Sequence, residues 1–263
     1  MQGQVTMPSR VEIFPLTGLP LINPGDDLAG MIVKQVRMKG LSIKNGDIIV
    51  IGQKVVSKSE GRVVDVSKVR ASKRALDLAR RVRRKAGFVE LVLRDAKKVA
   101  KASKQVLIVT TKQGFTCLNG GVDKSNVEGE RMYALLPVDP DMSARKIRAR
   151  IQRLTNRQVG LLITDTHSRP FRLGQVEETI GLAGLDPMAD YRGKHDLFGY
   201  QLRFKNVAVA DELAAAAELV MGQGTEATPV AIIRGVGRVE FKERARSSEL
   251  VVAVGQDLFK GTL

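Results

Sequence analysis

The stretch "LLITDTHSRPFRLG", from Leu161 to Gly174, changes character within a few residues. An apolar run ends at Asp165, and a threonine, a histidine, a serine, two arginines and a proline follow. The run predicts a buried strand. Either that strand ends at a surface turn, where Asp165 bonds its own backbone, or its carboxyl end carries a metal ligand beside an anion-binding loop. The flanking sequence has to separate these two interpretations.

Upstream of this stretch, the pattern predicts two strands and a helix. The residues "VEIF" (11–14) have strand character, and the prolines and glycines of 15–27 exclude regular structure. Asp27 is placed to cap a helix through "LAGMIVKQV" (28–36). "GDIIVIGQKVVSK" (46–58) is a turn followed by a β-branched run, which predicts a buried strand.

Three further segments complete the predicted elements. We expect two strands in "QVLIVTTKQGFTCLNGG" (105–121), a helix capped by Ser143 in "SARKIRARIQRLTN" (143–156), and a helix, a glycine loop and a strand in "AVADELAAAAELVMGQGTEATPVAIIRGV" (208–236). Strands and helices alternate irregularly, so the fold class is expected to be α+β, with mixed sheets and helices. The 263 residues suit a single unit, with 1–9 as a loose N-terminal extension.

The formal charge of +15 is concentrated in one segment. Residues 68–104 carry fourteen Lys and Arg against three carboxylates, a net charge of +11. Such a segment suggests nucleic-acid binding. However, Phe88 is its one aromatic residue, so platforms for base stacking are absent and a nucleic-acid partner is disfavoured. The charge can equally attract anionic substrates or solvate a helical face.

The same basic segment is predicted to be helical. Ser72 is a candidate cap for a first helix that closes before Gly87, and a second helix follows. The apolar residues at helical spacing are Leu78, Val82 and Ala86 in the first helix and Val89, Val92, Leu93 and Ala96 in the second.

The overall composition points to a soluble, cytoplasmic protein. Cys117 is the one cysteine, so no internal disulfide can form, as expected in a reducing compartment. No apolar run is long enough to cross a bilayer, and the first residues do not have the form of a signal peptide. We therefore expect no membrane partner.

Polar residues lie in glycine-rich or acidic turns that follow strand-like or helical runs, and "GLPLINPGDD" (18–27) is the first of them. "NGGVDKSN" contains Asp123 and Asn126, "TDT" contains Asp165 and Thr166, and "MGQG" contains Gln223. Glycines let backbone amides approach phosphate oxygens, and Asp, Thr and Gln oxygens are suitable ligands for magnesium or manganese. Together they could hold a nucleoside triphosphate and its metal.

Each of these signals also has a simpler interpretation. The glycine pair can be a tight turn, Gly222 a helix terminator, His167 an exposed loop residue, and Arg169 and Arg172 surface cations. A P-loop motif is absent. From the residues alone, the prediction stops at a soluble mixed α/β enzyme that binds an anion.

Seven segments, taken in order from Phe14 to Gly235, resemble the coenzyme F420:L-glutamate ligases, which add glutamate to the deazaflavin precursor F420-0. The segments are "FPLTGLPLINPGDDLA", "VVSKSEGR", "CLNGGVDKSNVEGE", "LLPVDPDMSARKIRARI", "ITDTHSRPFRLGQ", "IGLAGLDPMADYRGKHDLFG" and "VADELAAAAELVMGQGTEATPVAIIRG". The resemblance implies a two-lobed ligase fold, with residues of about 140–205 forming much of the second lobe, and an intertwined homodimer.

The resemblance also implies a reaction. GTP phosphorylates the terminal carboxylate of F420-0, GDP leaves, the amine of L-glutamate attacks the acyl phosphate, and phosphate leaves as an amide forms. Two divalent metal ions, manganese or magnesium, are implied, with potassium as an accessory ion. Positioning and charge neutralisation then do most of the catalytic work.

The resemblance assigns roles residue by residue. The implied metal ligands are Asp123, Asp165, Thr166 and Gln223. The implied nucleotide contacts are Leu19, Pro20, Leu21, Ile22, Lys58, Asn126, Gly222, Gln223, Gly224 and Thr225. No residue is assigned as a catalytic acid or base. We infer in addition that Arg169 and Arg172 contact an anionic substrate.

The chain departs from the family pattern at a few positions. Gly120 stands where Ala is expected, and Ser168 replaces a common Gly. Glu177 and Glu178 lie where the family is apolar or uncharged, and they could shift substrate preference. They keep open an alternative function, a paralogous GTP-dependent amide ligase that acts on another carboxylate acceptor.

Overall fold

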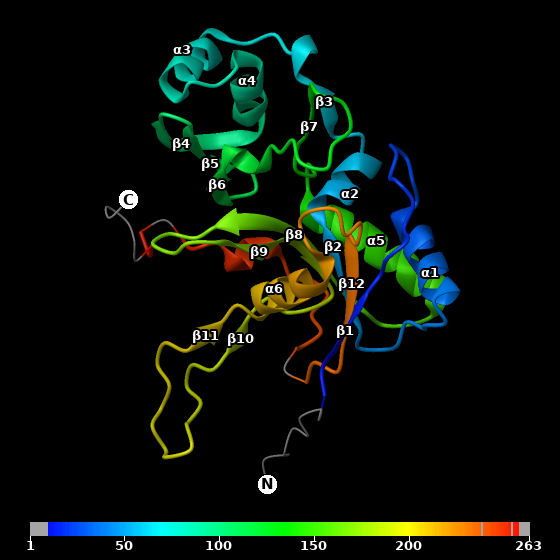
Figure 1. Cartoon of the computed structure of the whole chain (residues 1–263). Helices are drawn as coiled ribbons and strands as arrows, with labels where there is room; N and C mark the ends of the chain where they lie inside the picture. The colour runs from blue at the N-terminus through cyan, green and yellow to red at the C-terminus, as the bar shows by residue number, and fades with distance from the viewer. Residues whose placement is uncertain (1–9, 238, 254, 258–263) are drawn as a thin grey trace.

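The computed structural model describes residues 10–237, 239–253 and 255–257 (Figure 1). Its main element is a five-stranded sheet in which β2 and β8 run parallel and the other neighbours antiparallel. In spatial order the strands are β1 (Glu12–Pro15), β12 (Val230–Arg234), β2 (Ile48–Gly52), β8 (Gly160–Ser168) and β9 (Gln175–Ala183). This mixture of sheets and helices confirms the α+β prediction.

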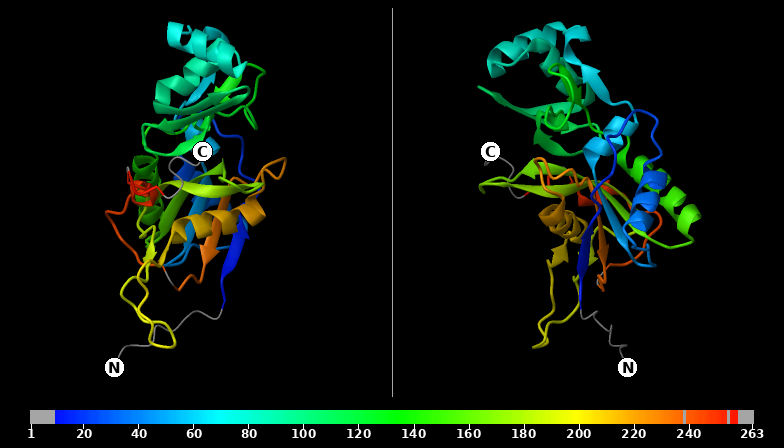
Figure 2. Two further views of the ribbon diagram at one scale, coloured as in Figure 1. Left: turned by 90° about the vertical axis from the view of Figure 1, so that its left-hand side faces the viewer. Right: turned by 45° about the vertical axis from the view of Figure 1, so that its right-hand side comes forward.

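Helices cover both faces of the main sheet (Figures 1 and 2). Helices α1 (Leu28–Met38) and α5 (Pro140–Thr155) pack on one face, and α6 (Val209–Met221) packs on the other. The period of two along a strand separates the side chains. Ile49 and Ile51 of β2 join the α1–α5 core, whereas Ile48 and Val50 join the α6 core.

A second region lies above the main sheet in Figure 1 and has an apolar core of its own. We call residues 63–134 the basic region. Its elements are β3 (Val63–Asp65), a 3₁₀ turn (Val66–Lys68), α3 (Lys73–Val82), α4 (Ala86–Asp95), β4 (Ala96–Ser103), β5 (Val106–Thr111), β6 (Thr116–Leu118), a second 3₁₀ turn (Asn119–Gly121) and β7 (Met132–Ala134). The strands pair as a β4-β5-β6 sheet and a β3-β7 pair.

Residues 140–205 supply α5, β8 and β9 to the main sheet and then a long hairpin. Its short strands β10 (Ala189–Asp190) and β11 (Asn206–Val207) pair, and the residues between them extend away from the body (Figure 1). The division of the chain into two lobes stays a prediction. A short 3₁₀ helix (Ser247–Leu250) follows near the carboxyl end.

Several predicted elements are confirmed. Asp27 caps α1, because its Oδ1 accepts a hydrogen bond from Gly30 N at 3.1 Å. The two strands of 105–121 and the helix, loop and strand of 208–236 are present. The predicted extension at 1–9 lies outside the described residues. Within the described part of the chain, no helix is both long and apolar enough to cross a membrane.

The strand prediction for 46–58 is wrong in its second half. The strand stops at Gly52, and α2 (Gln53–Ser59) begins at the next residue. Val56 is 1% exposed in the core, whereas Lys54 and Lys58, one turn apart, line a cavity. This helical amphipathicity overrides the local β propensity of the valines.

The cap prediction for 143–156 is also wrong. Helix α5 begins at Pro140, and Asp139 is its cap, with Oδ1 accepting from Met142 N at 2.8 Å. Ser143 lies inside the first turn, where its hydroxyl bonds the Asp139 carbonyl. Proline suits the first helical position because its missing N–H would have no partner there.

The basic segment is only partly helical. Helix α3 is capped by Ser72 as predicted, but it ends at Val82, where Arg83 turns into the left-handed region with φ 53°. Ala86 and Gly87 therefore belong to α4. A Cβ on Gly87 would lie 2.9 Å from the Val66 carbonyl oxygen, which explains a glycine inside a helix. Residues 96–103 form strand β4, not helix.

Candidate active site

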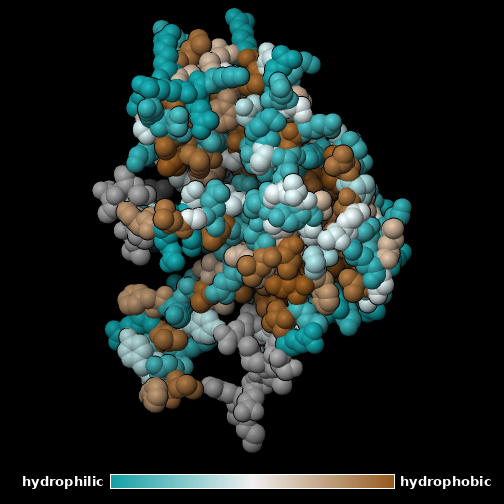
Figure 3. Space-filling model, viewed as in Figure 1, coloured by the Kyte–Doolittle hydropathy of each residue, from teal (hydrophilic) through white to brown (hydrophobic). Residues whose placement is uncertain are grey.

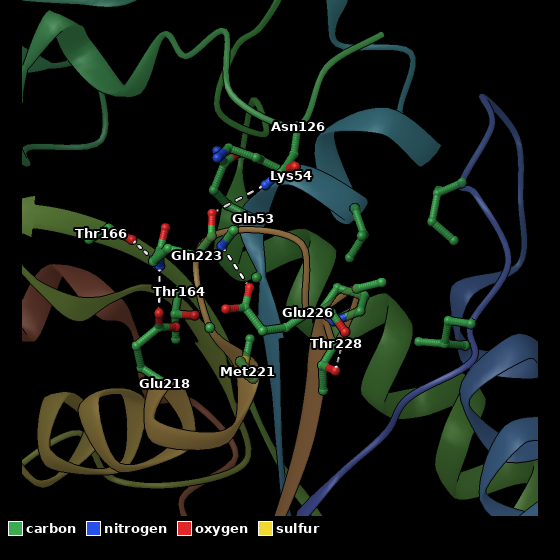
Figure 4. Close-up of a pocket in the computed structure, with 18 of the residues that line it drawn as sticks. Gln53, Lys54, Asn126, Thr164, Thr166, Glu218, Met221, Gln223, Glu226 and Thr228 are labelled. Atoms are coloured by element: carbon green, nitrogen blue, oxygen red, sulfur yellow. Dashed lines mark hydrogen bonds between the residues drawn. The ribbon is translucent and has the colours of Figure 1, made fainter.

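A cavity of about 470 Å³ opens at the end of the main sheet where the parallel strands β2 and β8 leave it (Figure 4). Its walls come from the loop after β1, helix α2, the β8–β9 ribbon, and the loop between α6 and β12. Twelve residues singled out from the sequence line it: Leu19, Pro20, Leu21, Ile22, Lys58, Asn126, Asp165, Thr166, Gly222, Gln223, Gly224 and Thr225. The carboxyl edge of parallel strands is a common ligand site.

Gln223 is at the centre of the polar contacts in this cavity. Its Nε2 lies 2.6 Å from Thr166 Oγ1, 2.8 Å from Glu218 Oε1 and 3.3 Å from Glu177 Oε2. Figure 4 shows Thr166 and Glu218, from β8 and α6, on either side of the Gln223 side chain. The fold thus brings the predicted ligands Thr166 and Gln223 into contact and adds two carboxylates.

Strand β8 does not end at Asp165, as the opening stretch suggested. It continues to Ser168 as a ribbon paired with β9, in which Thr166 lies opposite Glu177 and Asp165 opposite Glu178. Because side chains alternate along a strand, the two glutamates point to opposite faces. They belong to β9 and not to a loop, which corrects the sequence-based interpretation.

Glu177 is buried on the cavity side of the ribbon. It is 4% exposed, and its Oε2 accepts a hydrogen bond from Thr166 Oγ1 at 2.7 Å. Burial raises the pKa of Glu177 to about 7, and the neighbouring carboxylates Glu218 and Asp165 act in the same direction. Burial also raises the pKa of Glu218.

Asp165 is held by His167, which the sequence suggested to be an exposed loop residue. His167 is instead 6% exposed, with Nε2 at 3.2 Å from Asp165 Oδ2 and Nδ1 at 2.9 Å from Glu178 Oε2. Burial works against its charged form, but the bonds to Asp165, Cys117 and Glu178 outweigh this and raise the pKa of His167 to about 12. The imidazolium therefore fixes the Asp165 carboxylate.

Asp123 is linked to the cavity by Lys54 of helix α2. Its Oδ2 lies 2.7 Å from Lys54 Nζ and accepts from Ser125 Oγ at 2.6 Å. Burial opposes ionisation, but the bonds from Lys54 and Ser125 outweigh it and hold the pKa of Asp123 below its ordinary value. Asp123 itself is not among the cavity-lining residues, whereas Lys54 is.

Lys58, one turn after Lys54, also reaches the 123–126 loop. Its Nζ donates to the Asn126 carbonyl at 2.8 Å, and the Asn126 amide contacts the Gln223 carbonyl at 3.4 Å. Burial, followed by the charge of Lys54, lowers the pKa of Lys58. Two cations and a loop from the basic region therefore face the α6–β12 loop across the cavity.

The α6–β12 loop already holds one anion, the carboxylate of its own Glu226. Gly224 N donates to Glu226 Oε2 at 2.7 Å. Gly222 has a φ of +71°, and a Cβ there would lie 2.5 Å from the Glu226 carboxyl carbon. Glycine is required here for both reasons. The loop amide thus binds an oxyanion of the kind that a phosphate group presents.

Arg169 and Arg172 lie in the turn between β8 and β9, outside the cavity lining. Arg169 donates to the Leu173 carbonyl at 3.3 Å, and Arg172 is exposed. The structure does not bring these two arginines together with the other predicted site residues.

Sequence reasoning missed several polar residues of the cavity, among them Gln53, Lys54, Thr164, Glu218 and Glu226. Lys54 and Lys58 have the i, i+4 spacing of a helix face, a signal that the β-branched residues around them obscured. Glu218 lies inside an alanine-rich helix, where nothing in the pattern distinguishes it from a surface charge.

The donor chemistry fits a hard divalent cation. Among the described residues, no group of three His, Cys, Asp or Glu side chains is arranged to hold a metal. Thr166, Gln223 and Glu177 instead bring a hydroxyl, an amide and a carboxylate together, and such oxygen donors suit magnesium or manganese. Thr164 Oγ1, fully buried beside them, makes no hydrogen bond of normal geometry within the described structure and lies against the Glu177 carboxylate.

Comparison with known proteins agrees with this cavity. Residues 18–235 match the family model described as F420-0:gamma-glutamyl ligase. The chain belongs to this family. The matched range contains every residue that lines the cavity.

Members of this ligase family from archaea align over nearly the whole chain. A coenzyme F420:L-glutamate ligase from Archaeoglobus fulgidus is 43% identical, over 91% of this chain and 95% of the relative. Those from Methanocaldococcus jannaschii and Methanothermobacter thermautotrophicus are 40% and 39% identical, each over 95% of this chain and over 97% and 99% of the relatives.

Proposed function

We propose that the protein is a GTP-dependent ligase that adds L-glutamate to F420-0 in coenzyme F420 biosynthesis. The carboxylate of F420-0 attacks the γ-phosphorus of GTP, which gives an acyl phosphate and GDP. The amine of glutamate then attacks the acyl carbon, phosphate leaves, and an amide bond forms with loss of a proton. The observation that carries the proposal is the single cavity that gathers twelve of the expected nucleotide and metal positions.

The residues of the cavity suit the binding of a triphosphate. Lys54 and Lys58 present two ammonium groups, and the backbone of Gly222 to Thr225 forms the facing wall. A phosphate oxygen can replace the Glu226 carboxylate on the Gly224 amide. Preorganised cations and amides of this kind stabilise charge as the phosphoryl group is transferred.

Divalent cations would be held by Asp123, Asp165, Thr166 and Gln223, where they would neutralise negative charge on the transferred phosphoryl group. The chain's own part in this is to fix the ligands. His167 holds Asp165 through Nε2, and Ser125 holds Asp123 through its hydroxyl and its backbone amide. Potassium is included in the proposal as an accessory ion without an assigned site.

We also propose that the protein functions as a homodimer through the β10–β11 hairpin. Leu197, Phe198 and Phe204 are 97%, 95% and 90% exposed on it, and Figure 3 shows apolar residues on the projecting hairpin. Large apolar side chains gathered on a projecting arm are typical of an interaction surface. Light scattering is expected to give a dimer for the native chain and a monomer for Phe198→Ser/Phe204→Ser. An unchanged mass for this variant would contradict the proposed contact.

The paralogous ligase remains the second candidate, because Glu177 and Glu178 add two carboxylates to the site ribbon. An assay with GTP, F420-0, L-glutamate and manganese, followed by mass spectrometry, separates the two. A gain of one or two glutamyl units, lost in Asp165→Ala and retained in the surface control Asp77→Asn, is the expected result. GTP turnover without glutamylation would indicate a different acceptor, and absence of nucleotide binding would reject both functions.

A further inference from the structure

Glu177 occupies an unusual position for a carboxylate. It is 4% exposed, and its described contacts are with neutral groups: the hydroxyls of Thr166 and Thr164 and the amide of Gln223. Among the described residues, no lysine, arginine or histidine forms an ion pair with it, and it faces a cavity that also holds Asp165 and Glu218. A buried carboxylate beside other carboxylates is compensated either by a proton or by a cation.

The amide group of Gln223 lies at the point where a cation would bind. Nε2 lies within 2.6–3.3 Å of three oxygens, Thr166 Oγ1, Glu218 Oε1 and Glu177 Oε2, although an NH₂ group has only two hydrogens to donate. Three oxygens converging on one point is the arrangement that a cation takes up. A rotation of the amide by half a turn places its oxygen, a better metal ligand, at the same point.

Thr164 gives an independent observation at this place. Its Oγ1 is fully buried, lines the cavity and makes no hydrogen bond of normal geometry within the described structure, and the group it approaches is the Glu177 carboxylate. Thr164 and Thr166 are two residues apart on β8, so they share the face that Glu177 joins from β9. A buried hydroxyl that points at the same carboxylate without a well-formed hydrogen bond is a further oxygen donor around the point where a ligand would bind.

We propose that Glu177 is a direct ligand of the divalent cation that Thr166 and Gln223 hold. Thr166 and Gln223 are neutral donors, so Glu177 would add a negative charge to this metal site. The inference rests on the proposed function for the use of a metal. It assigns to Glu177 the role of binding and positioning the ion. Its neighbour Glu178 has a different role, because it faces the other way and bonds His167.

The test is a titration of the full-length, nucleotide-free protein with Mn²⁺, followed by electron paramagnetic resonance and calorimetry. Glu177→Gln keeps the size of the side chain and removes its charge. We expect it to weaken one class of Mn²⁺ site by at least about tenfold, as loss of an anionic ligand should, and to leave any other class unchanged. Glu212→Gln, an exposed charge removal on α6, is the matched control and should bind as the native chain does.

Thermal unfolding with and without Mn²⁺ separates ligation from a structural role. Glu177→Gln should be at least as stable as the native chain without metal, because a neutral amide replaces an uncompensated carboxylate, and should gain less stability on adding Mn²⁺. Glu177→Asp, which keeps the charge but shortens the reach, should bind Mn²⁺ with intermediate affinity.

Unchanged Mn²⁺ affinities in Glu177→Gln would overturn the inference. If the variant with unchanged affinities also has a raised KM for glutamate, Glu177 is instead a contact for the substrate amine. Failure of the proposed function is a separate outcome, in which the native chain binds Mn²⁺ through Glu177 but does not glutamylate F420-0.

Discussion

The cavity and the basic region hold charge in opposite ways. All fourteen cations of residues 68–104 are exposed, around an apolar core built from uncharged side chains. At the cavity the charges are less exposed: Glu177, in its wall, and His167, behind it on the same ribbon, are more than nine-tenths buried, and His167 fixes Asp165. Exposed charge is screened by water and salt, whereas buried charge acts at full strength. We therefore expect the chemistry to take place where charge is buried, not where it is abundant.

Among substitutions in the cavity, we expect the largest loss of activity at Gln223. Gln223→Leu keeps the bulk of the side chain but removes an amide that contacts Thr166, Glu177 and Glu218. We expect kcat/KM for glutamylation to fall by roughly 10²–10³-fold, the usual cost of losing one preorganised polar contact to the reacting group. Steady-state assays measure it. A loss below threefold would show that the contacts around Gln223 are not used in the reaction.

The next effect concerns pH in the metal-free protein. Burial raises the pKa of Glu177 from 4.5 to about 7, so the folded state favours the protonated form. The free-energy cost of burying the ionised Glu177 carboxylate is absent below pH 4.5 and complete above about pH 7. The free energy of unfolding should therefore fall as the pH rises through this window. The shift corresponds to about 3 kcal/mol.

Urea unfolding in a chelator at pH 5 and at pH 7.5 tests this expectation. The free energy of unfolding of Glu177→Gln, relative to the native chain, should increase between the two pH values. An equal difference at both would mean that the carboxylate is ionised throughout.

A smaller effect is expected at the cation that links the cavity to the basic region. Lys58→Met keeps the stem of the side chain and removes the ammonium that bonds the Asn126 carbonyl. We expect GTP affinity to fall by about tenfold, equivalent to about 1.4 kcal/mol, with kcat little changed. Lys68→Met, the removal of an exposed lysine outside the cavity, is the matched control. Equal GTP affinities for the two variants would remove Lys58 from the site.

The sequence predicted which residues belong to the cavity better than it predicted which way their side chains point. The glycine loop around Gln223 and the strand that carries Thr166 are local features, and local patterns identify them. The opposite directions of Glu177 and Glu178 depend on the register between β8 and β9, which no single segment contains. Likewise, α2 is a helix because Val56 packs into a core formed by distant residues. Pairing and packing between distant segments account for what could not be predicted.

The smallest catalytic effect is expected from the basic region itself. Lys97, Lys98 and Lys101 lie on β4, an edge strand of its sheet, and none of them lines the cavity. At physiological salt the Debye length is about 8 Å, so their charge acts weakly beyond their own surroundings. Replacing all three with Gln should change kcat/KM by less than about twofold. A tenfold loss would mean that the basic region guides an anionic substrate to the cavity.

The same triple variant separates two explanations for the lysines. An edge strand exposes unpaired backbone groups, and lysines on it oppose pairing with another chain. If that is their purpose, the variant aggregates faster in light-scattering measurements while its activity and its affinity for a DNA duplex change little. If duplex affinity at physiological salt instead falls steeply in the variant, the lysines form a nucleic-acid surface. The first result would make the largest concentration of charge in the chain a solubility feature, and would leave the few buried charges of the cavity as the functional ones.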